Sequence, residues 1–111
     1  MGQRDVAANI FLGREPCRLG FIVNRQRMLR EATKLIASLN VGLPSVRTKV
    51  SQLSGGQRQA TAVARAVSRK NLITLLDEPT AALGVREAAQ VLSLISKLHE
   101  SGQAVLLVSH N

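Results

Sequence analysis

The stretch "QLSGGQRQATAVARAV", residues 52–67, joins a serine and two glycines to a run with helical periodicity. Its apolar residues recur every three or four positions: Ala60, Val63, Ala64 and Val67. This spacing predicts a helix over residues 54–69, with Ser54 as its N-cap. Gly55 and Gly56 carry no Cβ, so a ligand can approach the backbone closely. Because a helix N-terminus attracts anions, the stretch predicts either a phosphate-binding turn or an ordinary capped helix.

Two apolar runs of strand length follow this helix, at residues 72–76 and 104–109. Continuous apolar runs are typical of strands covered on both faces. Residues 85–100 between them have helical spacing, and one side carries Val85, Ala88, Leu92, Ile95 and Leu98. A strand, a helix and a second strand in so short a segment predict a βαβ unit with parallel strands.

Polar residues stand where each predicted strand ends. Asp77 and Glu78 follow the first strand, and His110 follows the second. Because parallel strands end at the same edge of a sheet, we expect these groups to gather there. One carboxylate suits a hard cation such as Mg²⁺, and the other can polarise a water molecule. The alternative is a solvated strand end with a turn at Pro79 and a surface histidine.

The first half of the chain is predicted to be helical, with irregular connections. Residues 5–12 favour a short helix or turn, and residues 13–21 favour a loop broken by glycine and proline. Residues 24–39 have helical spacing, and Asn40, Gly42 and Pro44 end that helix. Residues 43–52 are predicted to be an extended connector. The apolar side of the long helix comprises Met28, Leu29, Ala32, Leu35, Ile36 and Leu39.

The composition is that of a globular chain with a strong excess of positive charge. Of 111 residues, 45% are hydrophobic and 20% are charged, and the net charge is +8. Such a charge is compatible with solubility alone, with binding to a nucleic acid or with contact to an anionic membrane surface. Phe11 and Phe21 are the only aromatic residues among Phe, Trp and Tyr, which argues against stacking on nucleic acid. A single cysteine, Cys17, excludes an internal disulfide and favours a cytosolic setting.

Three motifs in a fixed order resemble the C-terminal portion of the nucleotide-binding domain of ATP-binding cassette (ABC) transporters. "LSGGQ" at residues 53–57 matches the signature motif of that family, and "LITLLDEPT" at residues 72–80 matches its Walker B strand. "LLVSHN" at residues 106–111 is similar to its switch-histidine strand. "VAANIFLGREP" and "DEPTAALGV" further resemble bacterial importers of ribose, xylose and fructose. The resemblance covers essentially the whole chain.

The resemblance implies an α/β fold, part of a P-loop NTPase domain without its Walker A half. Residues 1–50 would match the helical subdomain, and residues 51–111 would hold the signature helix and two strands of the core sheet. The Walker A loop, GxxxxGK[ST], does not occur in the sequence. We therefore expect the isolated chain to bind ATP very weakly, to hydrolyse none and to be poorly soluble. Gly84, where many family members carry aspartate, marks the sugar-importer subtype.

The resemblance also implies a role for each motif residue. Asp77 would position Mg²⁺, Glu78 would be the general base, and His110 would contact the γ-phosphate. The signature turn would close over ATP held by a second ABC ATPase domain, in a homodimer or a fused tandem. Its residues are Ser54, Gly55, Gly56 and Gln57.

The implied setting is the cytoplasmic face of the inner membrane. The expected partners there are transmembrane permease subunits and, indirectly, a periplasmic sugar-binding protein. Two alternatives remain open: a soluble ABC ATPase of DNA repair or the ribosome, and a non-catalytic cassette that acts as an interaction module.

Overall fold

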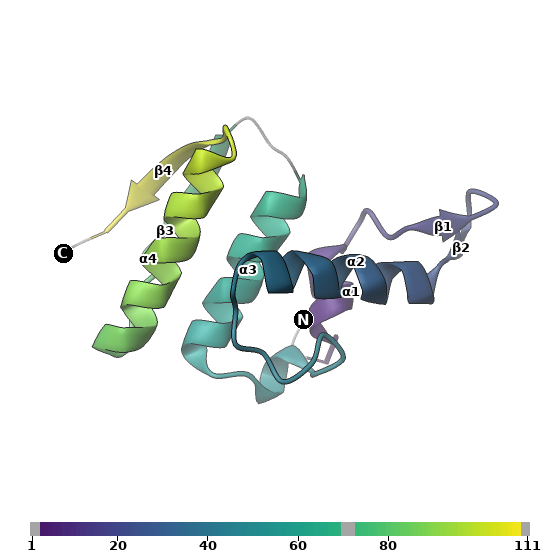
Figure 1. The fold of residues 1–111 in the computed structure, drawn as a ribbon, viewed down its shortest axis with the longest axis horizontal. Coiled ribbons are helices and arrows are strands. Elements are labelled where there is room, and N and C mark those ends of the chain that lie inside the picture. The colour runs from purple at the N-terminus through teal and green to yellow at the C-terminus, as the bar shows by residue number, and fades with distance from the viewer. Residues whose placement is uncertain (1–2, 70–72, 110–111) are drawn as a thin grey trace.

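A computed structural model describes residues 3–69 and 73–109 of the chain, which form a helical part and a small parallel sheet (Figure 1). The helical part contains α1 (Val6–Ile10), α2 (Arg25–Ser38), the 3₁₀ turn η1 (Val50–Gln52) and α3 (Gly55–Arg69). The sheet comprises β3 (Ile73–Asp77) and β4 (Ala104–Val108), which are connected by α4 (Val85–Glu100). A hairpin of two short strands, β1 (Cys17–Arg18) and β2 (Ile22–Val23), lies at the far end of the helical part.

The core of the molecule lies among α1, α2 and α3. Apolar side chains from all three helices form one buried cluster, which Leu94 of α4 also joins. Backbone hydrogen bonds close this part, because the Val6 and Ala7 amides donate to the Thr48 and Val46 carbonyls at 3.0 Å. The short helix α1 is thereby held between the connector and the longer helices. Its buried residues are Val6, Ala7 and Ile10.

Local signals account for where the helices begin. Asp5 caps α1 by accepting a hydrogen bond from the Ala8 amide at 2.8 Å. Asn24 caps α2 through the Arg27 amide at 3.2 Å. The helices expected over residues 24–39, 54–69 and 85–100 are confirmed to within a residue at each end. The segment expected as a loop over residues 13–21 is the exception, because Cys17–Arg18 pair antiparallel with Ile22–Val23.

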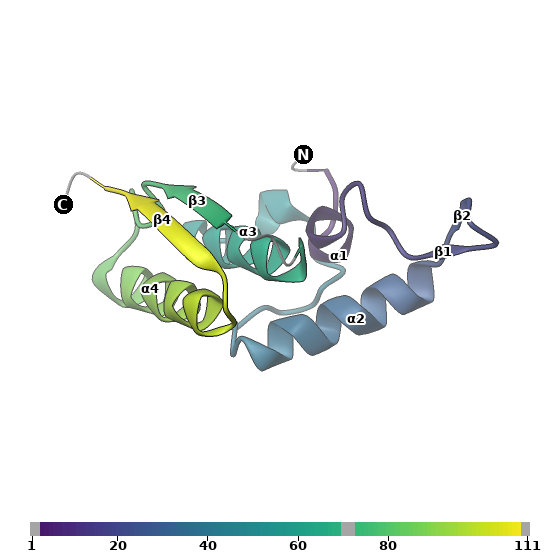
Figure 2. The ribbon, with the colours of Figure 1, turned by 90° about the horizontal axis from the view of Figure 1, so that it is seen from above.

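The two strands of the sheet pair in parallel, as the βαβ pattern predicts. Their register aligns Ile73 with Ala104 and Asp77 with Val108. Figure 2 shows α3 and α4 on one side of this sheet and no element of the described chain on its other side. The prediction of strands covered on both faces is therefore wrong for this chain. The exposed face carries aliphatic residues, and the exposed fractions of Ile73 and Leu75 are 68% and 64%.

The apolar side predicted for α4 is also corrected. The buried residues of this helix are Val91, Leu94 and Leu98, whereas Val85 and Leu92 are exposed. Apolar residues cover more than half of the circumference of α4. Helical spacing is therefore satisfied both by the predicted apolar side and by the side that is actually buried. The stripe that packs against α3 is selected by tertiary contact and not by spacing alone. No helix among the described residues is long and apolar enough to span a bilayer.

Candidate functional site

The turn before α3 is built as a reciprocal cap. The Gln57 amide donates to Ser54 Oγ at 3.2 Å, and the Ser54 amide donates to Gln57 Oε1 at 3.0 Å. This is a capping box, in which a serine and a glutamine three positions later satisfy each other's backbone groups. Gln57 Nε2 also donates to the Gly42 carbonyl at 3.0 Å, which ties the turn to the end of the α2 connection. The Gln57 side chain thus holds the turn in place.

The two glycines of this turn keep their amides available. The cap engages the amides of Ser54 and Gln57. Within the described part of the chain the amides of Gly55 and Gly56 make no hydrogen bond, although the Glu87 carboxylate lies beside Gly56. Both glycines are the first residues of a 15-residue helix. The positive end of the helix dipole and two open N–H groups therefore point in the same direction. This geometry fits an anionic oxygen of a phosphate.

The carboxylates expected to act on a cation and a water stand at the end of β3. Asp77 is the last residue of that strand and is exposed, and Glu78 follows it half-buried. The Glu78 amide donates to the Val108 carbonyl at 2.8 Å, which anchors the strand end to β4. Glu78 has a φ of 46°, in the left-handed region that non-glycine residues seldom adopt. This backbone turns the chain sharply away from the sheet immediately after Asp77.

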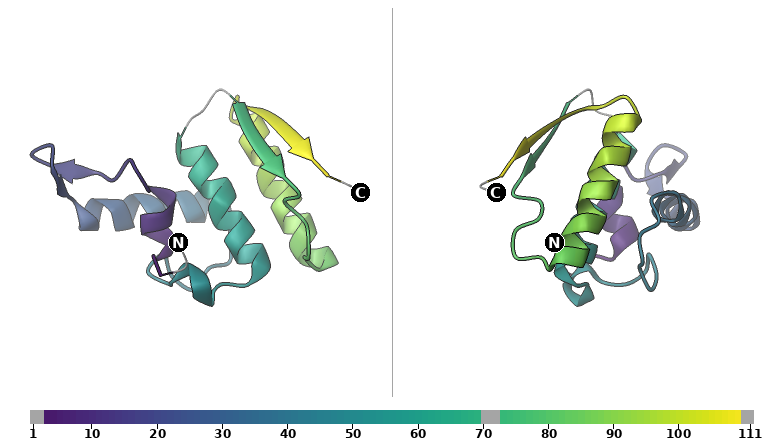
Figure 3. Two further views of the ribbon diagram at one scale, coloured as in Figure 1. Left: turned by 180° about the vertical axis from the view of Figure 1, so that it is seen from behind. Right: turned by 60° about the vertical axis from the view of Figure 1, so that its left-hand side comes forward.

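The turn after Glu78 leads back to the signature turn. It is held by hydrogen bonds from the Ala81 amide to the Glu78 carbonyl at 3.1 Å and from the Leu83 amide to the Thr80 carbonyl at 3.3 Å. Figure 3 shows β3 running toward the end of the molecule at which α3 and α4 both begin. Asp77 and Glu78 thus end a strand that points toward the glycine turn, and the segment after them reaches Gly55 through Leu83. His110 lies outside the described residues, two positions beyond the end of β4.

The donor set at this end fits a cation that takes few protein ligands. The described residues contain no group of three or more His, Cys, Asp or Glu side chains that could hold a metal. Mg²⁺ commonly binds one or two carboxylates and completes its shell with waters and phosphate oxygens. Asp77 is exposed and could supply one such carboxylate. Any further ligands would have to come from the nucleotide, from water or from other residues.

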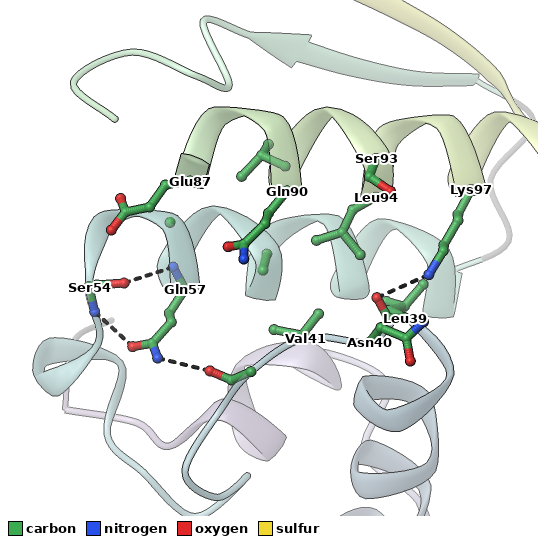
Figure 4. A pocket seen from close by; sticks show the side chains of 14 residues that line it. Leu39, Asn40, Val41, Ser54, Gln57, Glu87, Gln90, Ser93, Leu94 and Lys97 are labelled. Carbon is green, nitrogen blue, oxygen red and sulfur yellow. Dashed lines mark hydrogen bonds between the residues drawn. The ribbon is translucent and has the colours of Figure 1, made fainter. Parts of the chain in front are cut away.

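A pocket of about 380 Å³ runs alongside the turn, between α3, α4 and the connection that follows α2 (Figure 4). Ser54, Gly56 and Gln57 line one end of it, and Glu87 extends from α4 toward the same end. Lys97 closes the other end, where Nζ donates to the Leu39 carbonyl at 3.3 Å. The cap and the lysine contact hold the two sides of the pocket together.

Two residues at this site were not singled out from the sequence. Leu83 approaches Gly55 and Glu87 approaches Gly56. Nothing in the spacing of Leu83 or Glu87 indicates such a contact, because it depends on how the turn after β3 folds back. The reciprocal cap, in contrast, has a sequence signal in the Ser-x-x-Gln spacing of residues 54–57.

Comparison with known proteins places these features in a family. The family model described as "ABC transporter" matches residues 3–81. The chain is 50% identical over 103 residues to the xylose/arabinose import ATP-binding protein XylG of Sulfolobus acidocaldarius, covering 93% of this chain and 41% of that protein. It is 39% identical to the fructose import ATP-binding protein FrcA of Rhizobium meliloti, over 96% of this chain and 44% of that protein. The chain thus spans less than half the length of these relatives.

Solved structures show the same arrangement of elements. A dimeric ATP-binding cassette in a post-hydrolysis state, bound to ADP and Pi, matches with a TM-score of 0.75 and 25% identity, over 100% of this chain and 48% of that chain. A nucleotide-free ATP-binding cassette from an ABC transporter matches with a TM-score of 0.80, over 99% and 47% of the two chains. Its identity of 21% shows the fold alone. The expected α/β fold, as part of a cassette, is confirmed.

Proposed function

This chain belongs to the ABC transporter family, and from that premise we propose that it is part of the ATP-binding subunit of a bacterial sugar importer. ATP hydrolysis by the complete subunit would drive the uptake of a simple sugar such as ribose, xylose or fructose. The relatives named above are import ATP-binding proteins for xylose, arabinose and fructose. The observation that carries the proposal is the pair of open amides at Gly55 and Gly56, in a turn that Leu83, from the segment after Glu78, contacts.

The glycine turn would bind the γ-phosphate of ATP on a second ATPase domain. A helix N-terminus offers fixed N–H groups and a positive dipole end, which stabilise phosphate charge without moving a proton. The capping box supports this role, because Ser54 and Gln57 hold the turn while leaving the glycine amides open. Residues from one chain would thereby complete a site on another, in a homodimer or a fused tandem.

The carboxylates at the end of β3 would serve the nucleotide of their own domain. Asp77 would hold Mg²⁺ and Glu78 would orient and polarise the attacking water, with His110 at the γ-phosphate. Phosphoryl transfer depends mainly on positioning and on neutralising charge at the phosphate oxygens, so the placement of these groups matters most. The anchoring of Glu78 to Val108 at 2.8 Å supports a fixed position for the base.

The bare face of the sheet supports the view that hydrolysis needs a larger domain. Ile73, Leu75 and Leu106 are each more than half exposed on neighbouring strands. Burying such aliphatic surface contributes about 25 cal/mol per Å², so a face of this kind is stabilised by a covering segment. A segment that also carried a Walker A loop would supply the phosphate contacts that the 111 residues lack. We propose residues 1–50 as a helical subdomain and residues 51–111 as the segment that holds the signature helix and two strands of the core sheet.

The proposed setting is the cytoplasmic face of the inner membrane, where the subunit would dock onto transmembrane permease subunits. A periplasmic sugar-binding protein would deliver the sugar to the permease without touching this chain. The net charge of +8 is compatible with work beside an anionic membrane surface. The sugar itself is recognised by the permease and binding protein in this scheme, so no residue of this chain is assigned to it.

The test is an ATPase assay on the chain joined to the sequence encoded in frame ahead of residue 1. The proposal expects that upstream sequence to contain GxxxxGK[ST] and the joined protein to hydrolyse ATP. Glu78→Gln should lower turnover by at least about 100-fold while ATP binding persists, because the base is lost and the phosphate contacts remain. Glu100→Gln is the matched control, since Glu100 is exposed and is the last residue of α4, whereas Glu78 precedes the first.

Other outcomes of the same assay would overturn the proposal. A stop codon directly upstream, with no Walker A sequence, would contradict the enzyme assignment and favour an interaction module. Hydrolysis unaffected by Glu78→Gln would show that this carboxylate is not the base. If the joined protein hydrolyses ATP only when nucleic acid is added, the result would instead favour an ABC ATPase that acts on nucleic acid.

A further inference from the structure

The two signature glycines are not required by backbone conformation. Residues with a positive φ include Gly13, Gly20 and Gly102, whereas Gly55 and Gly56 lie in ordinary helical conformation at the start of α3. Any residue can adopt that conformation, and alanine would favour the helix more than glycine does. Something other than φ must therefore account for glycine at these two positions in this chain.

Close neighbours from the other side of the site fill the space that a Cβ would need. A Cβ added at Gly55 would lie 3.1 Å from Leu83 Cδ2. A Cβ added at Gly56 would lie 3.2 Å from Glu87 Cβ, and 3.3 Å from both Cγ and Oε2 of that residue. These distances are shorter than ordinary van der Waals contacts between carbon atoms. The turn after β3 and the first turn of α4 thus pack directly onto the backbone of the signature turn.

The two contacts differ in how easily they can give way. Leu83 Cδ2 is the far end of a flexible side chain, and a change of rotamer can move it. Glu87 Cβ is fixed to the backbone of α4, so a Cβ at position 56 would require α3 and α4 to separate by a few tenths of an ångström. The contact between Gly56 and Glu87 is therefore the rigid one, and Figure 4 shows Glu87 reaching from α4 toward the turn.

We propose that Glu87 is a positioning residue for the signature turn, acting through its contact with Gly56, and that Leu83 assists through Gly55. The contact fixes where the open amides of the turn lie relative to α4. The phosphate role of the turn rests on the function proposed above, but the packing itself does not.

A double-mutant cycle on the chain tests this contact by urea unfolding. Gly56→Ala should lower the folding equilibrium constant about tenfold, because overpacking outweighs the better helix propensity of alanine. Gly55→Ala should change it by no more than about twofold, since Leu83 can rotate away. In the Glu87→Gly background, Gly56→Ala should lose most of its effect. In the Glu100→Gly background, the matched control in the last turn of α4, the tenfold loss should persist.

Amide resonances in ¹⁵N-labelled chain separate positioning from a general loss of stability. Gly56→Ala should shift amide resonances in the first turn of α4 as well as in the signature turn, and adding Glu87→Gly should restore both sets. Glu87→Gln keeps the shape of the side chain, so stability and the Gly56 amide resonance should stay close to those of the unmodified chain.

Three results would overturn the proposal. Gly56→Ala could prove as stable as the unmodified chain, as expected if the glycine serves only the approach of a ligand. Glu87→Gly could fail to rescue it. The third result applies if Gly56→Ala does not fold. The contact would then be excluded if Glu87→Gly alone folds but Gly56→Ala combined with Glu87→Gly does not. No nucleotide is used, so these outcomes are independent of the ATPase assay.

Discussion

The helical part and the sheet differ in where their apolar side chains find partners. In the helical part, Val6, Ala7, Ile10 and Ala32 are completely buried. In the sheet, Leu75 and Leu106 are paired in register and yet 64% and 58% exposed. Both regions have apolar sequences, so composition does not distinguish them. The difference is that the helices meet other helices of the described chain, whereas one face of the sheet meets none.

This difference teaches which interactions hold the described chain together. The α1–α2–α3 cluster should carry most of its stability, since burial of aliphatic side chains is the dominant favourable term. The sheet contributes backbone pairing and one covered face. Substitutions in the two regions should therefore have very different effects on the free energy of unfolding. Four substitutions follow, in order of decreasing expected loss of that free energy.

Ile10→Ala should cause the largest loss. Ile10 is completely buried in the helical cluster, so its removal leaves a cavity that the surrounding helices can only partly fill. Such changes cost about 2–5 kcal/mol. Urea unfolding followed by circular dichroism measures the loss, and Ile10→Val is the conservative control. A loss below about 1 kcal/mol would contradict the assignment of the core to this cluster.

Thr74→Val should cause the next largest loss, and it tests the covered face of the sheet. Thr74 Oγ1 donates to Gln103 Oε1 at 2.8 Å, and both residues are buried. Removing the hydroxyl leaves the Gln103 oxygen without that partner, which costs about 1–3 kcal/mol. In the same unfolding experiment, the double variant Thr74→Val/Gln103→Leu should lose less free energy of unfolding than the sum of the losses in the two single variants. Strict additivity would indicate that the two side chains do not interact in solution.

Asp5→Ala should cost about 1 kcal/mol at neutral pH, because α1 loses its N-cap. Burial alone would raise the pKa of the Asp5 carboxyl, but hydrogen bonds from Arg25 and the Ala8 amide, with the nearby arginine charges, outweigh it and lower the pKa below 3.8. The charge-dependent contribution is therefore complete above pH 3.8 and is lost as the pH falls through the folded-state pKa.

The pH dependence of unfolding checks this assignment to Asp5. Asp5→Asn keeps an acceptor for the Ala8 amide but removes the charge that pairs with Arg25. Its stability should consequently fall less than that of the unmodified chain as the pH is lowered below 3.8. An unchanged pH dependence in Asp5→Asn would contradict a lowered pKa of Asp5.

Leu75→Ser should cause the smallest loss of folding free energy, within about 0.5 kcal/mol, because the side chain is already exposed. Its effect should appear in association: an uncovered apolar face favours aggregation, so the substitution should lower the sedimentation-derived mass at high concentration. A loss above about 1 kcal/mol would show instead that another copy of the chain covers this face in solution.

The sequence predicted the helices and the parallel strands well because their causes are local. Asn24 and Ser54 are caps beside regularly spaced apolar residues, and the βαβ order dictates parallel pairing. The hairpin at Cys17–Arg18 was missed because two-residue strands leave no periodicity to read. The buried side of α4 was misplaced because Val91 and Leu92 are both apolar neighbours, and only packing against α3 selects Val91.

The candidate site was foreseen in part for the same reasons. Ser54, the two glycines and Asp77 lie in short motifs that can be recognised along the chain. The contact of Glu87 with Gly56 depends on the left-handed backbone at Glu78 and on the path of the turn that follows, and neither leaves a local pattern. The assignment of catalytic roles to Asp77, Glu78 and His110 stays a prediction.

The hydrogen bonds from Val6 and Ala7 to Thr48 and Val46 have a consequence for synthesis on the ribosome. They close the first half of the chain upon itself, and α3 completes the buried cluster by Arg69. Chains emerge from the ribosome N-terminal end first, and early segments fold as they appear. The helical part can therefore form before β3 and β4 leave the exit tunnel. We expect the strands, whose outer face is apolar, to emerge beside a helical cluster that has already formed.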